Sequence, residues 1–250
     1  MIKIKDLHFS YGKKVIFESL NLMIPDSKFV SIIGPNGCGK STLLRLIGKD
    51  LDYQQGEIQI EGKALSDYST ASFSKLLAFN RQQVSGLFPF TCLDYVLMGR
   101  RPYKAQFEDY TKEDLNLVEK FLKLTDTMDF VHSTLNEVSG GELQRINLAK
   151  NLIQDTPILL LDESFSAMDI YHTVNSLNML KNSKRQKCIV CVMHDLNLVY
   201  QYSDYVILLK DGLLYAQGAP KEVLTEDAIK AVYGIQMEYI ENKGYIIKGG

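Results

Sequence analysis

Two glycine-rich segments of this sequence could each bind an anion. Residues 31–42, SIIGPNGCGKST, contain G-x-x-x-x-G-K-S between a continuous apolar run and a helical pattern. Glycines let successive backbone N–H groups turn toward phosphate oxygens at places where a Cβ atom would clash. Strand, motif and helix in this order predict a binding loop for the phosphates of a nucleotide. The predicted phosphate-binding residues are Gly34, Pro35, Asn36, Gly37, Cys38, Gly39, Lys40, Ser41 and Thr42.

Four side chains provide the chemistry that a nucleoside triphosphate and its metal ion require. Lys40 can reach the β- and γ-phosphates as a point charge, and the Ser41 hydroxyl can bind Mg²⁺. Asp162 ends the apolar run PILLL, so a parallel strand would place its carboxylate beside the phosphate loop as a second Mg²⁺ ligand. Glu163 follows directly and therefore points in another direction. It could orient or deprotonate a water molecule that attacks the γ-phosphorus.

The second glycine-rich segment is VSGGE, residues 138–142, at the start of an amphipathic helix. Ser139 and Glu142 have the spacing of a capping box, which explains these two residues without any ligand. It does not explain Gly140 and Gly141, because glycine in a first helical turn costs stability. The pair predicts close approach of the backbone to another group. Since one chain binds one nucleotide through Lys40, a second anion site would serve a nucleotide held by another subunit.

The remaining residues alternate between strand and helix patterns. The predicted strands lie in residues 2–12, 14–24, 28–34, 56–63, 157–163 and 187–195, with hairpins at Asp211-Gly212 and near Gly244. The phosphate loop leads into a predicted helix over residues 41–49. Two short, continuous apolar runs in the second half are typical of central parallel strands.

Residues 84–154 have a helical character instead. Capping boxes are predicted at Thr91 with Asp94 and at Thr111 with Asp114, and Leu115, Val118 and Leu122 form an apolar stripe at helical period. The predicted fold class is α/β: a nucleotide-binding core with a mainly parallel sheet and an N-terminal antiparallel β subdomain. We expect that core to comprise residues 1–84 and 155–250, interrupted by a helical insertion at about 85–154.

Composition restricts the class of protein. The chain has 250 residues, 46% hydrophobic and 23% charged, which suits a soluble globular protein. The net charge of −2 gives no electrostatic reason to expect a nucleic-acid partner. No apolar run is long enough to span a bilayer, and the first residues lack a signal-peptide pattern, so we expect a cytosolic protein. Four cysteines suggest no disulfide framework, and Cys188 and Cys191 are expected to be structural.

Taken together, these motifs resemble those of the ATP-binding cassette (ABC) ATPases along essentially the whole chain. VSGGE resembles their signature motif, which in that family contacts the γ-phosphate of ATP bound to the opposite subunit. The resemblance implies a homodimer in which two copies pair head to tail around two ATP molecules. Glu142 replaces the commoner glutamine, which keeps the capping role and adds a charge near phosphate.

The resemblance implies roles for further residues. Tyr11, in FSYGKK, matches the aromatic residue that stacks on adenine, and His194, in VMHDLN, matches the histidine that contacts the γ-phosphate. Ser166 and Asp169, in FSAMD, match the loop that crosses the dimer interface.

In the same way, Asp162 and Glu163 match the Mg²⁺-associated aspartate and the catalytic glutamate. The usual proline and threonine after that glutamate are Ser164 and Phe165 here, which leaves the conformation of the loop open.

The glutamine that couples nucleotide to the membrane partner lies in FNRQQ. Counting from Ala78-Phe79 favours Gln82, and Gln83 is the alternative, because Arg81 replaces the proline that often precedes this glutamine. In the family this residue approaches Mg²⁺ and the attacking water.

Finer features resemble the importers of iron chelates, haem and cobalamin: MGRRPY at residues 98–103, the MHDLN run, and residues 209–235. They imply a peripheral subunit at the cytoplasmic face of the cell membrane that hydrolyses ATP. Its partners would be integral membrane permease subunits and, through them, an extracytoplasmic substrate-binding protein. Arg100 and Arg101 could lie near the permease or form a solvated patch. The alternatives are a soluble ABC ATPase acting on ribosomes or nucleic acid, a non-catalytic nucleotide-gated module, and an exporter ATPase.

Overall fold

A computed structural model describes residues 1–81, 90–183, 187–241 and 244–247 of the chain. Contacts divide the chain into two compact units. One comprises Met1–Tyr68 with Lys184–Gly250, and the other comprises Ser69–Ser183. The predicted helical insertion, about 85–154, falls in the second unit.

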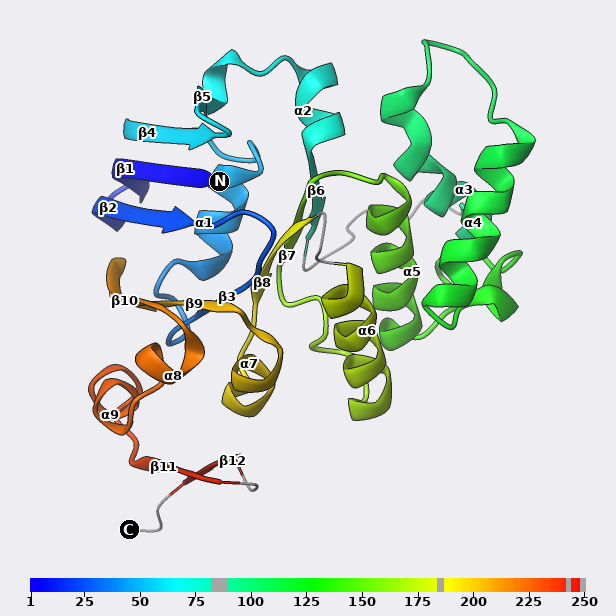
Figure 1. Cartoon of the computed structure of the whole chain (residues 1–250). Helices are drawn as coiled ribbons and strands as arrows, with labels where there is room; N and C mark the ends of the chain where they lie inside the picture. Colours follow the sequence, from blue (N-terminus) through cyan, green and yellow to red (C-terminus); the bar gives the residue numbers. More distant parts are fainter. Residues whose placement is uncertain (82–89, 184–186, 242–243, 248–250) are drawn as a thin grey trace. The chain divides into compact units, whose positions relative to one another are not determined.

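The first unit begins with an antiparallel sheet, as predicted. Its strands are β1 (Ile2–Tyr11), β2 (Lys14–Ile24), β4 (Gln55–Ile60) and β5 (Lys63–Ala64), in the order β2-β1-β4-β5. Apolar residues alternate with exposed polar ones along β1 and β4, so one face of the sheet is buried. Figure 1 shows β1, β2 and β4 side by side.

The same unit contains predominantly parallel strands in the order β10-β9-β3-β8. Here β3 (Phe29–Ile33) lies between β8 (Cys188–Val192) and β9 (Tyr205–Lys210), parallel to both, and every residue of β3 and β8 is buried. An antiparallel hairpin joins β9 to β10 (Leu213–Gly218) through Asp211 and Gly212, which both have positive φ, 48° and 77°. The predicted continuous buried strands and the Asp-Gly hairpin are therefore confirmed.

The helices of this unit are short. They are α1 (Lys40–Ile47), the 3₁₀ helix η1 (Leu65–Asp67), α7 (Leu196–Tyr202), α8 (Pro220–Val223) and α9 (Glu226–Tyr233). The second predicted hairpin is also confirmed, because β11 (Met237–Ile240) pairs with β12 (Gly244–Ile247) and Ile240 lies opposite Gly244.

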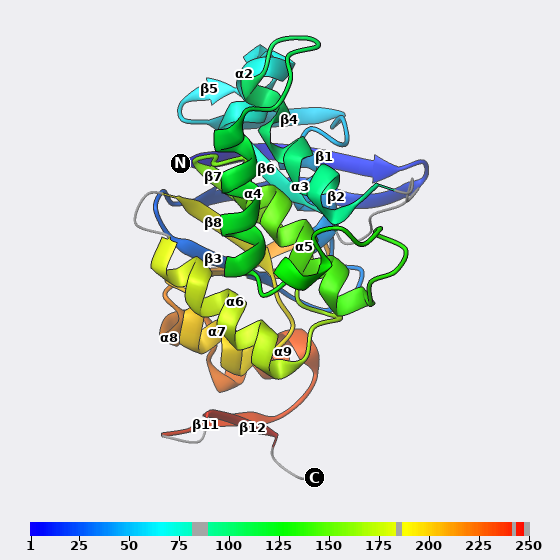
Figure 2. The same cartoon turned by 90° about the vertical axis from the view of Figure 1, so that its right-hand side faces the viewer.

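The second unit contains two parallel strands and a group of helices (Figure 2). The strands are β6 (Leu77–Asn80) and β7 (Ile158–Leu161). The helices are α2 (Thr70–Leu76), α3 (Cys92–Leu97), η2 (Met98–Tyr103), α4 (Lys112–Leu124), η3 (Met128–Phe130), α5 (Gly140–Ile153) and α6 (Ile170–Ser183). Apolar side chains of α3, α4 and α5 pack into one core cluster that includes Val96, Val118, Leu122 and Ile146. No helix in the described part of the chain is long and apolar enough to cross a membrane.

The predicted apolar stripe of α4 is partly wrong. Val118 and Leu122 are completely buried, but Leu115 is 39% exposed. In the first turn of α4 the buried side chain is polar. Asp114 is only 4% exposed and accepts hydrogen bonds from charged side chains. The inward position in this turn therefore belongs to a carboxylate and not to leucine.

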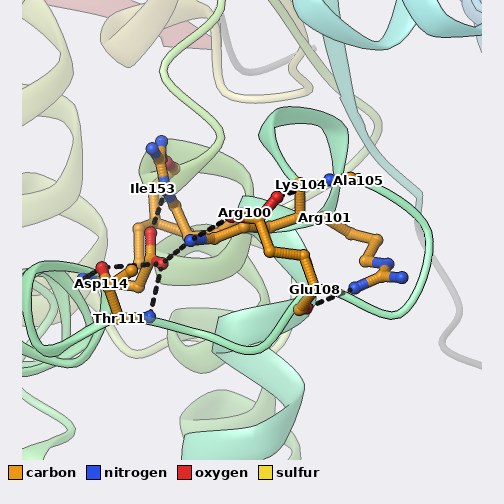
Figure 3. Close-up of polar contacts among 8 residues, drawn as sticks. All are labelled: Arg100, Arg101, Lys104, Ala105, Glu108, Thr111, Asp114 and Ile153. Atoms are coloured by element: carbon orange, nitrogen blue, oxygen red, sulfur yellow. Dashed lines mark hydrogen bonds and ion pairs between the residues drawn. The ribbon is translucent and has the colours of Figure 1, made fainter.

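Asp114 is the centre of a polar cluster that joins η2, α4 and α5 (Figure 3). Its carboxylate accepts hydrogen bonds from Arg100 Nε at 3.1 Å, Lys104 Nζ at 2.7 Å and the Thr111 backbone N–H at 3.0 Å. Arg100 also donates to the carbonyl of Ile153 at 3.1 Å. Burial alone would raise the pKa of Asp114, but these hydrogen bonds outweigh it and hold the pKa well below its ordinary value.

The geometry of this cluster excludes one of the two alternatives for MGRRPY, the solvated patch, at Arg100. Arg100 is largely buried and fixed by Asp114, and its guanidinium lies 4.4 Å from the centre of the Tyr103 ring, so it is not part of a solvated patch. Arg101 is exposed and donates to the carbonyl of Glu108. Gly99 holds η2 directly against α5, because a Cβ atom there would collide with the carbonyl oxygen of Lys150.

Candidate functional site

The predicted phosphate loop connects β3 to α1, and two of its glycines are required by packing. Gly34 has φ +148°, and a Cβ atom there would collide with the carbonyl oxygen of Leu209. Gly39 has φ +104°, and its Cβ would lie 2.6 Å from the Phe17 ring. Any larger residue at either position would displace the loop from the neighbouring strands.

Lys40 lies at the centre of this loop. It is the first residue of α1, it is 5% exposed, and its Nζ donates to the carbonyls of Gly34 at 2.8 Å and Pro35 at 2.9 Å. The N-cap of α1 is Gly39, which has no side chain to accept from the first turn. Backbone N–H groups at this helix start and the ammonium of Lys40 therefore form an environment suited to phosphate oxygens.

The other loop residues differ in exposure. Pro35 is half-buried, Asn36 and Gly37 are exposed at the tip, and Ser41 and Thr42 are half-buried in the first turn of α1. Cys38 is 4% exposed, and burial raises the pKa of its thiol, with the nearby Lys40 charge acting in the opposite direction. The side chain therefore remains a neutral thiol at pH 7 and is a packing residue of the loop.

Tyr11 ends β1 and presents an aromatic ring to solvent. It is 42% exposed, and its ring meets Phe9 edge-on with 4.8 Å between ring centres. Its hydroxyl accepts a hydrogen bond from Arg45 at 3.2 Å, so α1 orients the ring. A half-exposed ring held at both its edge and its hydroxyl suits stacking with a planar base. The sequence did not indicate this role of Arg45, because its contact with Tyr11 depends on where β1 ends.

His194 follows β8 at the sheet edge where the phosphate loop begins. The strands β3 and β8 are parallel, Ile32 lies opposite Val192, and the N–H of Met193 donates to the carbonyl of Ile32 at 3.3 Å. His194 is exposed. The next residue caps α7, because the Asp195 carboxylate accepts from two backbone N–H groups of that helix. The structure therefore places Tyr11, His194 and the loop in one unit.

In the second unit, Asp162 and Glu163 follow the fully buried strand β7. Asp162 is 4% exposed, and its N–H donates to the carbonyl of Asn80 at 3.0 Å. Glu163 has a positive φ of 48°, which is uncommon for a residue with a side chain. This backbone conformation turns the chain sharply directly after Asp162. A residue held in such a conformation at the end of a buried strand is a candidate for function.

The predicted cap of the VSGGE helix is confirmed. The Ser139 hydroxyl accepts from the N–H of Glu142 at 3.4 Å, and the Glu142 carboxylate accepts from the N–H of Ser139 at 2.7 Å. These hydrogen bonds from Ser139 lower the pKa of Glu142, with a smaller contribution from the charge of Arg145. Glu142 therefore stays ionised and engaged in the cap.

The two glycines of this motif have different surroundings. A Cβ atom on Gly141 would lie 2.9 Å from the carbonyl oxygen of Ala167, whereas one on Gly140 would be in ordinary contact, 3.8 Å from the Ala167 Cβ. Gly141 is therefore needed for packing inside this chain. Packing among the described residues gives no such reason for Gly140, so Gly140 remains the residue for which we expect a group outside this chain.

Ser166 and Asp169 lie in the loop that passes this helix start. Gln144 of α5 donates to the Ser166 hydroxyl at 3.1 Å and accepts from the N–H of Ala167 at 3.0 Å. Asp169 directly precedes α6, and its carboxylate accepts from the N–H of His172 at 2.9 Å. The structure thus brings the signature residues and this loop together. The sequence motifs did not point to Gln144, although a polar residue three positions after Gly141 was a possible signal.

Gln82 and Gln83 lie outside the described residues. The other predicted ligands of Mg²⁺ are the Ser41 hydroxyl, next to the phosphate loop, and the Asp162 carboxylate, at the end of β7. Hydroxyl and carboxylate oxygens fit Mg²⁺, which usually takes one or two protein ligands together with substrate phosphates.

Comparison with known proteins identifies the class. Residues 17–166 match the family model described as ABC transporter, which is more than half of the chain. The chain belongs to the ABC transporter family, and it is an ATPase of that family that couples hydrolysis to transport. Both the predicted fold class and the resemblance are thereby confirmed.

The similar proteins cover nearly the whole chain. It is 36% identical over 243 residues to the "Probable siderophore transport system ATP-binding protein YusV" of Bacillus subtilis, which covers 96% of this chain and 88% of that protein. It is 34% identical to the "Ferric enterobactin transport ATP-binding protein FepC" of Escherichia coli, with 95% and 89% covered. A solved "Dimeric Structure of MJ0796, a Bacterial ABC Transporter Cassette" has a TM-score of 0.78 and 29% identity, with 88% and 99% covered.

Proposed function

We propose that this chain is the ATP-hydrolysing subunit that energises an importer of iron chelates of the siderophore type. The observation that carries this proposal is similarity over nearly the full length to siderophore-transport ATPases, in a chain that keeps each described residue of the hydrolytic set. The resemblance of MGRRPY and of residues 209–235 to the same branch of importers supports it.

The phosphate loop binds ATP in this proposal. Lys40 and the backbone N–H groups of the first turn of α1 hold the β- and γ-phosphates, and Tyr11 stacks on adenine. Ser41, Asp162 and Gln82 would hold Mg²⁺, which supplies charge compensation on the phosphates. Glu163 orients and deprotonates water, and His194 contacts the γ-phosphate. Fixed cationic and N–H groups around the transferring phosphoryl group give the largest catalytic contribution.

Two copies of the chain complete each site. Ser139, Gly140, Gly141 and Glu142 of one copy approach the γ-phosphate held by the other, and Ser166 and Asp169 lie at the interface. The similarity to a dimeric cassette supports this arrangement. ATP closes the dimer, and hydrolysis with product release opens it. The dimer drives alternating access of the permease subunits at the cytoplasmic face of the cell membrane, with cargo delivered by a substrate-binding protein.

Copurification tests the transporter assignment. Affinity-tagged chain, extracted in mild detergent from its native cells, is expected to retain a polytopic membrane protein. Reconstituted vesicles of that complex should take up a ferric siderophore only with ATP. Copurification with ribosomal subunits, or ATP-driven efflux of cargo, would favour the soluble ATPase or the exporter instead.

The different surroundings of Gly140 and Gly141 predict different consequences of a methyl group. Gly140→Ala should not lower the melting temperature, since alanine favours helix by up to about 1 kcal/mol and the position has room. Its ATP turnover should fall about tenfold or more, the loss expected when a charge-assisted hydrogen bond to phosphate is disturbed.

Thermal unfolding and phosphate release measure the two effects separately. Gly141→Ala is the matched contrast, because its Cβ meets the Ala167 carbonyl and should lower both stability and turnover. Full turnover of Gly140→Ala in the ATP-bound dimer would show that no phosphate approaches this helix start.

A further inference from the structure

A chain of buried polar side chains joins β6, α3 and α5 in the second unit. The Asn147 amide, on α5, donates to the side-chain oxygen of Asn80, on β6. Tyr95, on α3, donates from its hydroxyl to the side-chain oxygen of Asn147 at 2.9 Å. Asn151, one turn further along α5, donates to the carbonyl of Asn147 at 2.7 Å. All four residues are at most 6% exposed, so these groups depend on one another for hydrogen bonds.

Asn80 connects these hydrogen-bonded side chains to β7, the strand that Asp162 and Glu163 follow. It is the last residue of β6 and lies opposite Leu161 in β7, and its carbonyl accepts from the N–H of Asp162. The backbone of Asn80 is therefore hydrogen-bonded to Asp162, and its side chain is hydrogen-bonded to Asn147 of α5. Since α5 begins at Gly140, one amide links the end of β7 to the helix of the VSGGE motif.

Stability alone gives no reason for amides at these positions. Buried hydrogen bonds contribute little net free energy, and a well-packed apolar pair of similar shape is often as stable. An amide pair differs from an apolar pair in being directional, so it permits a single register between helix and strand. Apolar side chains lie next to both residues in sequence or register, since Ile146 precedes Asn147 and Leu161 lies opposite Asn80, and both are completely buried.

The Tyr95 hydroxyl lies in a buried environment that keeps it protonated. Burial raises the pKa of Tyr95 to about 12, so its hydroxyl stays a donor at neutral pH. The Lys150 ammonium lies 4.6 Å from the centre of the Tyr95 ring. Burial, followed by the charge of Arg81, lowers the pKa of Lys150. Arg81 directly follows Asn80 in the chain.

We propose that Asn80 and Asn147 are positioning residues for ATP hydrolysis. Their amide contact holds α5, with Ser139 to Gly141 at its start, in register with the end of β7, which carries Asp162 and Glu163. This inference rests on the proposed catalytic roles of those residues. Both amides are buried in the second unit, so their loss should change the geometry of the hydrolytic step and not ATP binding by the phosphate loop.

The test separates register from stability with a double substitution. Asn80→Leu or Asn147→Leu alone leaves one amide buried without its partner, and the melting temperature should fall by several degrees. The double variant removes both amides and should regain part of that loss, with the Tyr95 hydroxyl still lacking its acceptor. Its kcat for ATP hydrolysis should nevertheless remain at least tenfold below that of the parent, with KM for ATP within twofold. Parent-level kcat in the double variant would overturn the inference.

Two further variants keep the result interpretable. Thr127→Val removes another buried hydroxyl of the same unit, bonded to the carbonyl of Leu122, and should lower the melting temperature without changing kcat. If the double variant does not fold, Tyr95→Phe carries the test, because it removes only the hydroxyl that orients Asn147. A kcat at least threefold lower at unchanged KM supports the inference, and an unchanged kcat overturns it.

Glu163→Gln, assayed alongside, distinguishes this inference from the proposed function. Turnover that survives Glu163→Gln would refute the catalytic assignment itself. An inactive Glu163→Gln together with a fully active double variant would refute only the positioning role of the two amides.

Discussion

Glu163→Gln is expected to lower kcat for ATP hydrolysis by at least about 10²-fold while ATP still binds. General-base catalysis contributes roughly 10²–10⁴-fold, and glutamine keeps the size of the side chain but cannot accept the proton of the attacking water. The backbone around residue 163 is fixed by the turn after β7, where the carbonyl of Glu163 accepts from the N–H of Ser166. The phosphate loop that binds ATP is not altered.

Phosphate release at saturating ATP measures the loss, and binding of a fluorescent ATP analogue measures the retained affinity. The blocked enzyme should also accumulate as an ATP-bound dimer, which size-exclusion chromatography would detect. Glu119→Gln is the matched control, since Glu119 lies on the exposed surface of α4 and pairs with the neighbouring Lys123 at 3.6 Å. Turnover of Glu163→Gln equal to that of Glu119→Gln would remove Glu163 from its role.

Asp114→Ala should have the largest effect on folding, lowering the free energy of unfolding by about 3–5 kcal/mol. Removing one partner of a buried ion pair leaves the others charged and unpaired, which is the costly case. Here Arg100 would lose its carboxylate, Lys104 would keep the exposed Glu108, and α4 would lose half of its capping box. Urea unfolding followed by circular dichroism measures the change.

Glu108→Gln is the control for Asp114→Ala, because it removes an exposed partner of the same Lys104. Its effect should be much smaller than that of Asp114→Ala, as for other surface ion pairs. Equal effects of the two substitutions would contradict a central role for Asp114.

The same carboxylate should make stability sensitive to acid. Its pKa in the folded protein is depressed, so its contribution is complete above the unfolded pKa of about 3.9 and is lost as pH falls further toward the folded value. The parent should therefore lose stability below about pH 4 more steeply than Asp114→Ala does.

Local rules predicted much of the fold. Alternation and continuous apolar runs identified strands such as β1 and β3, and Asp211-Gly212 marked a turn that needs two positive φ values. Capping residues located the starts of α4 and α5 correctly. These features depend on residues within a few positions of one another, so the sequence displays them directly.

Contacts between distant segments could not be predicted in this way. The bond from Arg45 to Tyr11, the amide pair of Asn80 and Asn147, and the approach of Ala167 to Gly141 each join residues far apart in the chain. Even the exposure of Leu115 follows from the position of Asp114, which depends on Arg100 in another element. Side-chain type suggests such partners but does not choose among them.

The helix α5 is fixed at both of its ends. Near its start Gln144 holds the loop at Ser166 and Ala167, and near its finish the Ile153 carbonyl accepts from Arg100 while Gly99 fits closely against Lys150. With contacts at both ends, this helix of 14 residues is restrained from rotating about its axis or shifting along it independently of its neighbours. The helix is about 21 Å long, so a displacement of η2 is expected to move the VSGGE end of α5 at that distance.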